Sequence, residues 1–431
     1  MTDHRPATAA AARARMAADL RVNGRAVSKP IRDAFASVPR HQFVPQVGAA
    51  EAYRDEAFVL KCGPDGVPVS SSSQPAMMAI MLEQLDLRPG HRVLEIGTGS
   101  GYNAAIMALM TGPDGAVTTV DIDAELVSRA RASLAGAGFG DVSVQCADGG
   151  FGAPEQAPFD RIIVTAGAWD IAPAWLDQLA PAGRLVLPLS VCGLELSVAL
   201  ERSEDGWLSQ SACRCGFVRM LGAFARPQLA IRLGGSDVAV IQLADDVPMD
   251  GDGVAAALTG DHVEIGTGVR IQGDGELADL DMWLTLTEPE LCRLSVLRPA
   301  SPVSREIMPV GGIATSVDDA RTIGIAALML SASGLRGPEA RVRGYGPGGE
   351  VLAGYLAGRC LTWAELGRPR AEEVTLRVWP RATAPLLPPG TVVLDRPSVR
   401  IAVGWPGQAA AGPEGPGPEG AGQGSPGWAW G

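Results

Sequence analysis

The chain has 431 residues, of which 46% are apolar, and it carries a formal net charge of −12 at pH 7. At about 150 residues per domain, this length predicts two or three domains with well-buried cores. The negative charge argues against nucleic acid as the main partner, because phosphate binding needs a cationic surface.

The first residues contain no continuous apolar segment of the kind that a secretory signal requires. The longest apolar stretch with helical character lies within residues 322–330, far short of the roughly 20 residues that span a bilayer. The seven cysteines are an odd number without regular spacing, which is typical of reduced thiols in a cytoplasm. We therefore expect a cytoplasmic protein that does not contact a membrane.

Helices are predicted over residues 8–22, 29–37 and 76–85, with an extended turn enforced by two prolines in 39–45. Apolar strands then alternate with amphipathic helices. The strands are centred on 93–96, 117–120, 142–144, 162–164 and 185–187, and the helices cover 103–110 and 124–135. This alternation predicts an α/β fold in which a parallel, Rossmann-like sheet lies between two layers of helices.

The pattern changes after residue 188. Two strand-like runs, 194–201 and 208–215, flank an Asp-Gly pair that signals a hairpin and adds antiparallel strands to the sheet. Residues 228–404 contain a predicted helix over 318–333 and several short strand candidates, and they indicate a separate α+β domain. The strand candidates are 238–243, 262–265, 282–286 and 374–378.

Residues 93–102 read VLEIGTGSGY, an apolar strand that ends in a glycine-rich turn. Gly97, Gly99 and Gly101 allow a tight bend with backbone N–H groups beside a ligand, and a side chain at any of them is expected to fill the ligand's space. The GxGxG spacing, with Glu95 before it, differs from the GxGxxG of nicotinamide and flavin binders. It resembles the turn of class I methyltransferases that use S-adenosyl-L-methionine. The predicted cofactor-binding residues of this segment are Glu95, Gly97, Thr98, Gly99, Ser100 and Gly101.

Acids follow the next two strands, at the edge of the sheet where parallel strands present ligands. Asp121, next to Ile122, follows the second strand and is placed to accept hydrogen bonds from ribose hydroxyls. Asp148, next to Ala147, follows the third strand and is placed to accept from an adenine amino group. These four residues also belong to the predicted cofactor site, whereas Asp123 is expected to cap the following helix.

Five further motifs agree in sequence and order with one known family. They are VPRHQFVP at 38–45, AYRD at 52–55, SQP at 73–75, NAA at 103–105 and APFDRIIVTA at 157–166. With them, residues 1 to about 225 resemble the protein-L-isoaspartate O-methyltransferase family. The chain departs from the family pattern at Ala147 and Ala182, where the family has glycine, and at Ser71-Ser72, where it has Thr-Ile.

The resemblance implies transfer of a methyl group from S-adenosyl-L-methionine to the carboxylate of an isoaspartyl, or unusually an aspartyl, residue in a peptide. By position Ser73 is the catalytic serine, with Ser70, Ser71 and Met78 near the ligand. A carboxylate with a pKa near 4 is already ionised at pH 7, so the reaction needs no general base. Its methyl ester is then expected to close to a succinimide (aspartimide) and open to isoaspartate without enzyme groups.

We predict four parts: N-terminal helices and a substrate-loop segment in 1–90, the methyltransferase core in 91–227, an accessory domain in 228–404 and a disordered Gly/Pro-rich tail in 405–431. The layout resembles a subgroup that tailors ribosomally made cyclic peptides such as lanthipeptides and graspetides. The accessory domain would then recognise a cyclised precursor peptide, or would instead form a homodimer.

Two alternatives stay open. A general isoaspartyl repair enzyme would methylate short isoaspartyl peptides and lose little when residues 228–431 are deleted. A peptide-binding scaffold without turnover would have no need for an intact glycine turn, Asp121, Asp148 and Ser73. No metal is expected, because the paired Cys213 and Cys215 have no second Cys/His pair near them in sequence, and the four histidines form no catalytic set.

Overall fold

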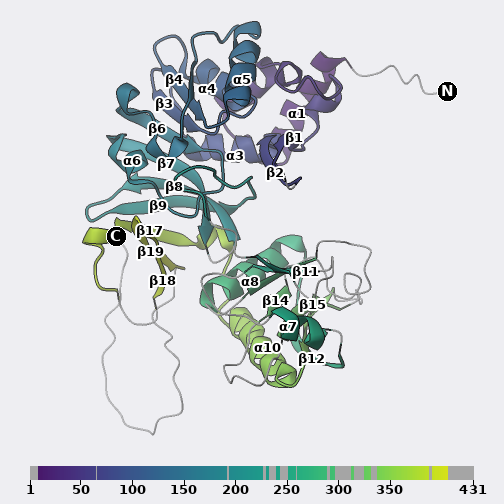
Figure 1. The fold of residues 1–431 in the computed structure, drawn as a ribbon. Coiled ribbons are helices and arrows are strands. Elements are labelled where there is room, and N and C mark those ends of the chain that lie inside the picture. The colour runs from purple at the N-terminus through teal and green to yellow at the C-terminus, as the bar shows by residue number, and fades with distance from the viewer. Residues whose placement is uncertain are drawn as a thin grey trace, which may run out of the picture.

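The computed structural model describes residues 8–64, 66–191, 194–226, 230–232, 239–242, 251–258, 260–288, 292–296, 312–314, 325–331, 337–387 and 391–405 (Figure 1). The helices are α1 (Ala9–Val22), α2 (Lys29–Ser37), α3 (Pro75–Leu85), α4 (Tyr102–Thr111), α5 (Ala124–Gly136), α6 (Pro173–Asp177), α7 (Gly251–Leu258), α8 (Asp274–Thr287) and α10 (Gly349–Glu365). Short 3-10 helices are η1 (Arg40–Gln42), η2 (Glu51–Tyr53), η3 (Gly149–Phe151), η4 (Pro154–Gln156), η5 (Ala371–Glu373) and η6 (Arg381–Thr383).

The strands of the N-terminal half are β1 (Phe58–Cys62), β2 (Pro68–Ser72), β3 (Arg92–Ile96), β4 (Ala116–Asp121), β5 (Ser143–Cys146), β6 (Phe159–Val164), β7 (Leu179–Val191), β8 (Leu194–Arg202) and β9 (Trp207–Arg214). Those that follow are β10 (Ala230–Arg232), β11 (Ala239–Gln242), β12 (His262–Arg270), β13 (Cys292–Val296), β14 (Gly312–Ala314), β15 (Ile325–Leu330), β16 (Glu339–Tyr345), β17 (Thr375–Pro380), β18 (Val392–Asp395) and β19 (Val399–Gly404).

Within the described ranges, ten strands form the main sheet in the order β18-β19-β17-β9-β8-β7-β6-β3-β4-β5. The five strands from β5 to β7 are parallel, as the alternation of strands and helices predicts. The strands from β8 onward are antiparallel, and the predicted hairpin joins β8 to β9. The predicted α/β fold with added antiparallel strands is therefore confirmed.

Both faces of the inner parallel strands β3 and β6 are buried, which explains why neighbouring residues in them are apolar. Val93 and Leu94, neighbours on β3, are each fully buried but belong to two different hydrophobic clusters. The cluster around Val93 contains apolar residues from α1 to α5, such as Ile106 on α4. The cluster around Leu94 contains Trp175 from α6 on the opposite face.

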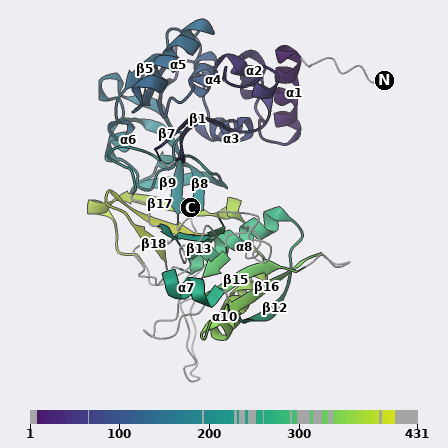
Figure 2. The ribbon, with the colours of Figure 1, turned by 45° about the vertical axis from the view of Figure 1, so that its right-hand side comes forward.

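The C-terminal strands extend the same sheet, as Figure 2 shows below β9. Strand β17 pairs antiparallel with β9 through Val378 opposite Trp207, and Leu376 N donates to Ser209 Oγ at 2.8 Å. Leu376 and Trp283 of α8 belong to the same hydrophobic cluster as Leu94. Strands β17 to β19 thus share a sheet with the N-terminal half, and α8 shares a core with it, while the predicted domain boundaries stay a prediction.

Two other predictions for the C-terminal region are wrong. Part of the helix predicted over 318–333 is strand β15, which pairs along its length with β16, and residues 315–324 lie outside the described residues. The strand predicted over 282–286 belongs to α8, where Leu280, Met282 and Trp283 are buried. A short apolar run fits a buried strand and a buried helix equally well, so periodicity cannot separate them.

The other strand candidates of this region correspond to β11, β12 and β17, and α10 packs against β12 and β16. The predicted disordered tail lies, from residue 406 on, outside the described residues. None of the helices in the described ranges has both the length and the apolar character that a bilayer crossing requires.

Candidate active site

The glycine-rich turn lies at the carboxyl end of β3, between the ends of β4 and β6. Gly97 N donates to the Val120 carbonyl on β4 at 2.8 Å, and Thr165 N donates to the Ile96 carbonyl at 2.8 Å. Gly97, Gly99 and Gly101 have φ values of 104°, 50° and 83°, in the region that side chains disfavour. The sequence therefore needs glycine at these three positions for backbone reasons alone.

The three glycines have different surroundings. A Cβ at Gly99 would lie 3.3 Å from the Ser71 carbonyl oxygen, and one at Gly97 would lie 2.5 Å from Thr165 Oγ1. A Cβ at Gly101 would instead meet Ala130 and Leu134 on α5, each at 3.3 Å. The expectation that all three glycines keep space for a ligand is therefore wrong for Gly101, which allows α5 to approach the turn.

Glu95 lies beneath the turn and is completely buried. Its Oε1 accepts from Asn103 Nδ2 at 2.8 Å, and its Oε2 accepts from Thr119 Oγ1 at 2.7 Å. The Thr119 hydroxyl also contacts the Thr98 hydroxyl at 2.8 Å. Burial raises the pKa of Glu95 to about 7, although the hydrogen bonds from Thr119 and Asn103 oppose this rise.

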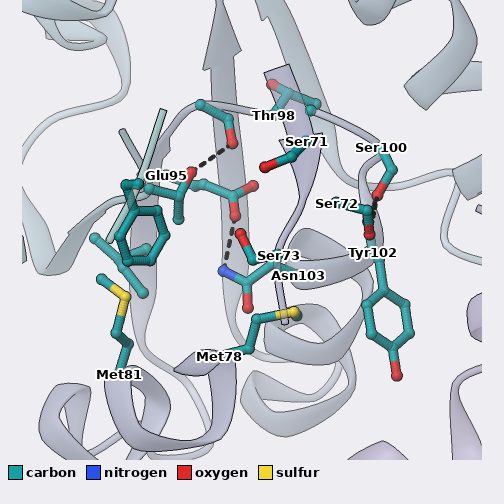
Figure 3. Close-up of a pocket in the computed structure, with 15 residues that line it drawn as sticks. Ser71, Ser72, Ser73, Met78, Met81, Glu95, Thr98, Ser100, Tyr102 and Asn103 are labelled. Carbon is teal, nitrogen blue, oxygen red and sulfur yellow. Dashed lines mark hydrogen bonds between the residues drawn. The ribbon is translucent and has the colours of Figure 1, made fainter. Parts of the chain in front are cut away.

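A small cavity of about 30 Å³ lies above this network, between the turn and the serine segment, by which we mean residues 70–73 (Figure 3). Asn103 Oδ1 is buried in its wall and has no hydrogen-bond partner among the described residues. Hydroxyl groups of Ser71, Ser73 and Thr165 belong to the same wall. An unpaired amide oxygen and several hydroxyls suit a ligand end that carries both an ammonium and a carboxylate group. The cavity has room for only a few water molecules, so it could hold only one end of a larger ligand.

The serine segment begins within strand β2, and Arg40 holds its last residue, Ser73. The fully buried guanidinium of Arg40 donates to the Ser73 carbonyl at 2.8 Å and to the carbonyls of Ala52, Arg54 and Glu56 at 2.9 to 3.0 Å. Burial lowers the pKa of Arg40 to about 10, and Tyr102 opposes this change, so Arg40 is a cation at neutral pH. The motifs at 38–45, 52–55 and 73–75 therefore meet at the side chain of Arg40.

Asp55 fixes the residues that follow Ser73. Its Oδ1 accepts from Ala76 N at 2.8 Å in the first turn of α3, and its Oδ2 accepts from Gln74 Nε2 at 3.0 Å. A carboxylate is favourable at this position, since the first N–H groups of a helix have no partner within the helix. Ser73 itself is half-buried and faces the cavity next to Asn103 (Figure 3).

The two predicted nucleotide-binding acids lie at the ends of neighbouring strands. Asp121 Oδ2 accepts from Gly99 N at 2.9 Å, and its Oδ1 accepts from Asp123 N at 3.0 Å. Next to it, Ile122 exposes 43% of its surface. Asp148 accepts from Gly150 N at 2.9 Å and from Ala223 N at 2.7 Å, so the segment around 222–223 covers it. Asp123 caps α5 as predicted, accepting from the N–H groups of residues 125 and 126.

The cavity brings together part of the predicted set. It is lined by the predicted residues Ser71, Ser73, Met78, Glu95, Gly97, Thr98, Gly99 and Ser100. The predicted residues Ser70, Gly101, Asp121, Ile122, Ala147 and Asp148 lie outside this wall. The lining also includes residues that sequence reasoning did not assign: Ser72, Met81, Tyr102, Asn103, Ile163, Thr165 and Phe217. The sequence contained a signal for Asn103, because this residue begins the NAA motif at 103–105, just after the glycine turn and in the first turn of α4.

Burial raises the pKa of Cys213 to about 11 and that of Cys215 further, so both thiols are protonated at neutral pH. In the part of the chain that the structure describes, no three His, Cys, Asp or Glu side chains gather as a metal site would require. His41 contacts the Tyr53 hydroxyl at 2.7 Å in the turn after α2, away from the cavity lining.

A parallel sheet with a GxGxG turn after its first strand and acids after the next two defines the class I methyltransferases. The family model for protein-L-isoaspartate(D-aspartate) O-methyltransferase (PCMT) matches residues 11–223. The chain is 41% identical over 221 residues to the protein-L-isoaspartate O-methyltransferase of Methanopyrus kandleri, covering 50% of this chain and 95% of that protein. It is 42% identical over 180 residues to protein-L-isoaspartate O-methyltransferase 2 of Archaeoglobus fulgidus, and the match covers 42% of this chain and 79% of that protein. The chain belongs to the protein-L-isoaspartate O-methyltransferase family.

Solved structures are more distant. One described as a protein-L-isoaspartate O-methyltransferase has a TM-score of 0.48 at 22% identity and covers 84% of this chain and 95% of its own. A structure of a putative protein-L-isoaspartate O-methyltransferase from Plasmodium falciparum, in complex with S-adenosyl-L-homocysteine, has a TM-score of 0.43 at 19% identity. The match covers 48% of this chain and 98% of that chain. The assignment of the family therefore rests on the sequence matches.

Proposed function

We propose that this enzyme methylates the free carboxylate of isoaspartyl residues in peptides and proteins, as a repair methyltransferase does. The observation that carries the proposal is that one cavity joins the glycine turn, the unpaired Asn103 Oδ1 and Ser73. These residues lie within 11–223, the part of the chain that matches the family. The methyl donor of this class is S-adenosyl-L-methionine, which supplies an electrophilic methyl group when bound.

The residues of the cavity fit the amino-acid end of that donor. Asn103 Oδ1 would accept a hydrogen bond from the α-ammonium group, and hydroxyls of the serine segment would donate to the α-carboxylate. Asp121 holds the turn through Gly99, and its remaining acceptor capacity would serve the ribose hydroxyls, while Ile122 would offer an apolar surface to the adenine. Asp148 has acceptor capacity left for the adenine amino group, because each of its oxygens accepts one bond in the structure.

Ser73 orients the substrate carboxylate. That carboxylate is ionised at pH 7 and is itself the nucleophile, so the enzyme needs to align it and to exclude water. Arg40 holds the carbonyl group of Ser73, and Asp55 holds Gln74 and Ala76 after it, which fixes the position of the Ser73 hydroxyl. The methyl ester then loses methanol as the neighbouring backbone nitrogen closes a succinimide, which hydrolyses to aspartate or isoaspartate.

Methylation kinetics of Ser73→Ala test this role. With an isoaspartyl peptide, we expect a fall in kcat of about 10²-fold, in the range of a lost positioning or hydrogen-bonding group, with unchanged affinity for S-adenosyl-L-homocysteine. Ser37→Ala, at an exposed serine that ends α2, is the matched control. Equal kcat values for wild type and Ser73→Ala would contradict the role of Ser73.

A second candidate function is the tailoring of a ring-constrained peptide made on the ribosome, with aspartate as the methylated residue. The observation that favours it is the large C-terminal region, whose strand β17 and helix α8 are built into the catalytic sheet and core. The same region is also a candidate dimerisation element. Comparing the methylation rates of cyclised and linear forms of one aspartyl peptide with that of a short isoaspartyl peptide distinguishes tailoring from repair.

Deleting residues 228–431 does not distinguish them. Strand β17 covers the edge of β9 and packs beside Trp207, so the deletion would expose an unpaired strand and part of the core. Loss of activity in the truncated chain is expected for either function.

A further inference from the structure

A second cavity lies beside the serine segment and is much larger. It has a volume of about 620 Å³, within the range of about 300–1,000 Å³ that is typical of ligand pockets. It runs between α1, η2 and the start of α3, and Arg25 and Arg214 complete its wall. We name it the α1–α3 groove.

The groove lies next to the candidate catalytic serine in the chain. Gln74 lines the α1–α3 groove, and the preceding residue, Ser73, lines the small cavity. A peptide whose isoaspartyl carboxylate contacts Ser73 therefore has the groove beside its flanking residues. Apolar side chains such as Leu20 and Met77 and polar ones such as Asn23 line it together, a mixture that suits a polypeptide better than an apolar ligand.

The charged residues of the groove lining are two arginines, Arg25 and Arg214, and two aspartates, Asp19 and Asp55. Arg214 ends β9, next to Cys213, and Arg25 is close enough to oppose the burial that raises the pKa of the Cys213 thiol. Both arginines are thus near the same end of β9. Arg25 is exposed and forms no ion pair within the described part of the chain. Both carboxylate oxygens of Asp55 already accept hydrogen bonds, from Gln74 Nε2 and Ala76 N. Where the two guanidinium groups lie, an anionic group is the ligand chemistry that they favour.

Arg214 is held in place by the C-terminal region. It donates to the Ala278 carbonyl and to Asp281 Oδ2 of α8, each at 3.1 Å, and the side chain of Asp281 is only 2% exposed. Asp281 lies outside residues 11–223, which the family model matches. The region that distinguishes this chain from the matched part of the family therefore positions one wall of the groove.

We propose that the α1–α3 groove binds the polypeptide substrate beside its isoaspartyl residue, and that Arg25 and Arg214 select a peptide with an acidic side chain at that end. This inference rests on the proposed function and specifies its substrate class. It also gives the C-terminal region a role in catalysis, since α8 positions Arg214 toward the substrate.

The test is a set of short isoaspartyl peptides in which one Glu, or Gln or Lys in its place, is moved along the flanking positions. For the full-length wild type, we expect one position at which Glu raises kcat/KM about tenfold over Gln, mainly through KM. Arg25→Gln should reduce this preference to less than about threefold. Arg15→Gln, at an exposed arginine on α1 outside the groove lining, should keep it.

Arg214 needs a double variant, because its removal alone would leave Asp281 buried without its cation. Arg214→Gln with Asp281→Asn removes both charges, and it should lose the preference while binding S-adenosyl-L-homocysteine as the wild type does. Equal kcat/KM for Glu, Gln and Lys peptides, or a preference that persists in Arg25→Gln and in the double variant, would overturn the groove proposal alone. If the wild type binds S-adenosyl-L-homocysteine but methylates none of the peptides, the proposed function itself fails.

Discussion

Arg40 Nη2 donates a 2.8 Å hydrogen bond to the backbone carbonyl oxygen of Ser73, although 33 residues separate them in the chain. The same guanidinium binds three further carbonyls around η2, and its ring neighbours are Phe58 and Tyr102. A buried cation with this many backbone acceptors fixes the loop that carries the serine. The geometry of the candidate active site therefore depends on a residue that lies outside the cavity lining.

Arg40→Lys tests this dependence. Lysine has fewer donors and no planar fork, so at least one buried carbonyl loses its partner, and we expect a loss of about 3 kcal/mol in the free energy of unfolding. The kcat of the folded protein should fall at least about tenfold, since Ser73 is no longer fixed. Denaturant unfolding and methylation kinetics measure the two effects.

Arg161→Lys is the matched control. Arg161 is also a buried arginine, and it donates to the Leu85 carbonyl at 2.7 Å at the far end of α3. Its replacement should lower stability in a similar way while kcat of the folded protein stays unchanged. A kcat for Arg40→Lys equal to that of the control would show that Arg40 has only a structural role.

Gly99→Ala should weaken donor binding. Alanine in the left-handed region costs about 1–2 kcal/mol, and the new Cβ would lie 3.3 Å from the Ser71 carbonyl, which pushes the serine segment away from the turn. We expect about tenfold weaker binding of S-adenosyl-L-homocysteine by calorimetry. Gly138→Ala, which also has a positive φ of 88° but no atom within 4 Å of the new Cβ, should keep wild-type affinity.

Asp121→Asn should also weaken donor binding. Each carboxylate oxygen of Asp121 accepts from one backbone N–H, and an amide can accept only one of these bonds because its NH2 group faces the other donor. The cost is about 1–3 kcal/mol, shared between stability and affinity. At the neighbouring cap, Asp123→Asn should change affinity little, since Asn is an equally good N-cap. Similar affinities for both variants would argue against a binding role for Asp121.

The buried Glu95 predicts a pH dependence of stability. Its pKa is about 7 in the folded protein, above the ordinary value of 4.5 for a glutamate, so the folded state holds the proton more tightly. The stability that comes from this protonation is present below pH 4.5 and is lost as the pH rises to about 7. Glu95→Gln should remove this part of the slope, so the variant gains stability relative to the wild type from pH 5 to 8 in ligand-free unfolding experiments. Parallel curves for the two proteins would contradict the prediction.

The N-terminal half of the fold could be predicted because its local patterns agree with its tertiary structure. The helix predicted over 29–37 has the bounds of α2, and the Asp-Gly pair forms the β8–β9 hairpin. The patterns of the C-terminal half are ambiguous, since the apolar residues of β15 and α8 fit either kind of element. The pairing of β17 with β9 joins segments about 170 residues apart, and sequence patterns carry no signal for such a contact.

The candidate site was partly predictable for the same reason. The glycine turn and the acids follow strands, and a parallel sheet brings strand ends together whatever the rest of the chain does. Arg40, Thr165 and Phe217 come from three separate segments, and their positions depend on packing that only the structure shows. Arg40 appeared in the sequence as part of a turn motif, without any sign that its partners are the carbonyls around Ser73.

Methyl transfer to a matched pair of peptides tests the central claim most directly. The full-length protein would be incubated with S-adenosyl-L-methionine that carries a labelled methyl group, and with two peptides that differ only in an isoaspartyl or aspartyl linkage. We expect base-labile label on the isoaspartyl peptide and little on its aspartyl twin. Absence of label from the isoaspartyl peptide, with protein that binds S-adenosyl-L-homocysteine, would contradict the assignment.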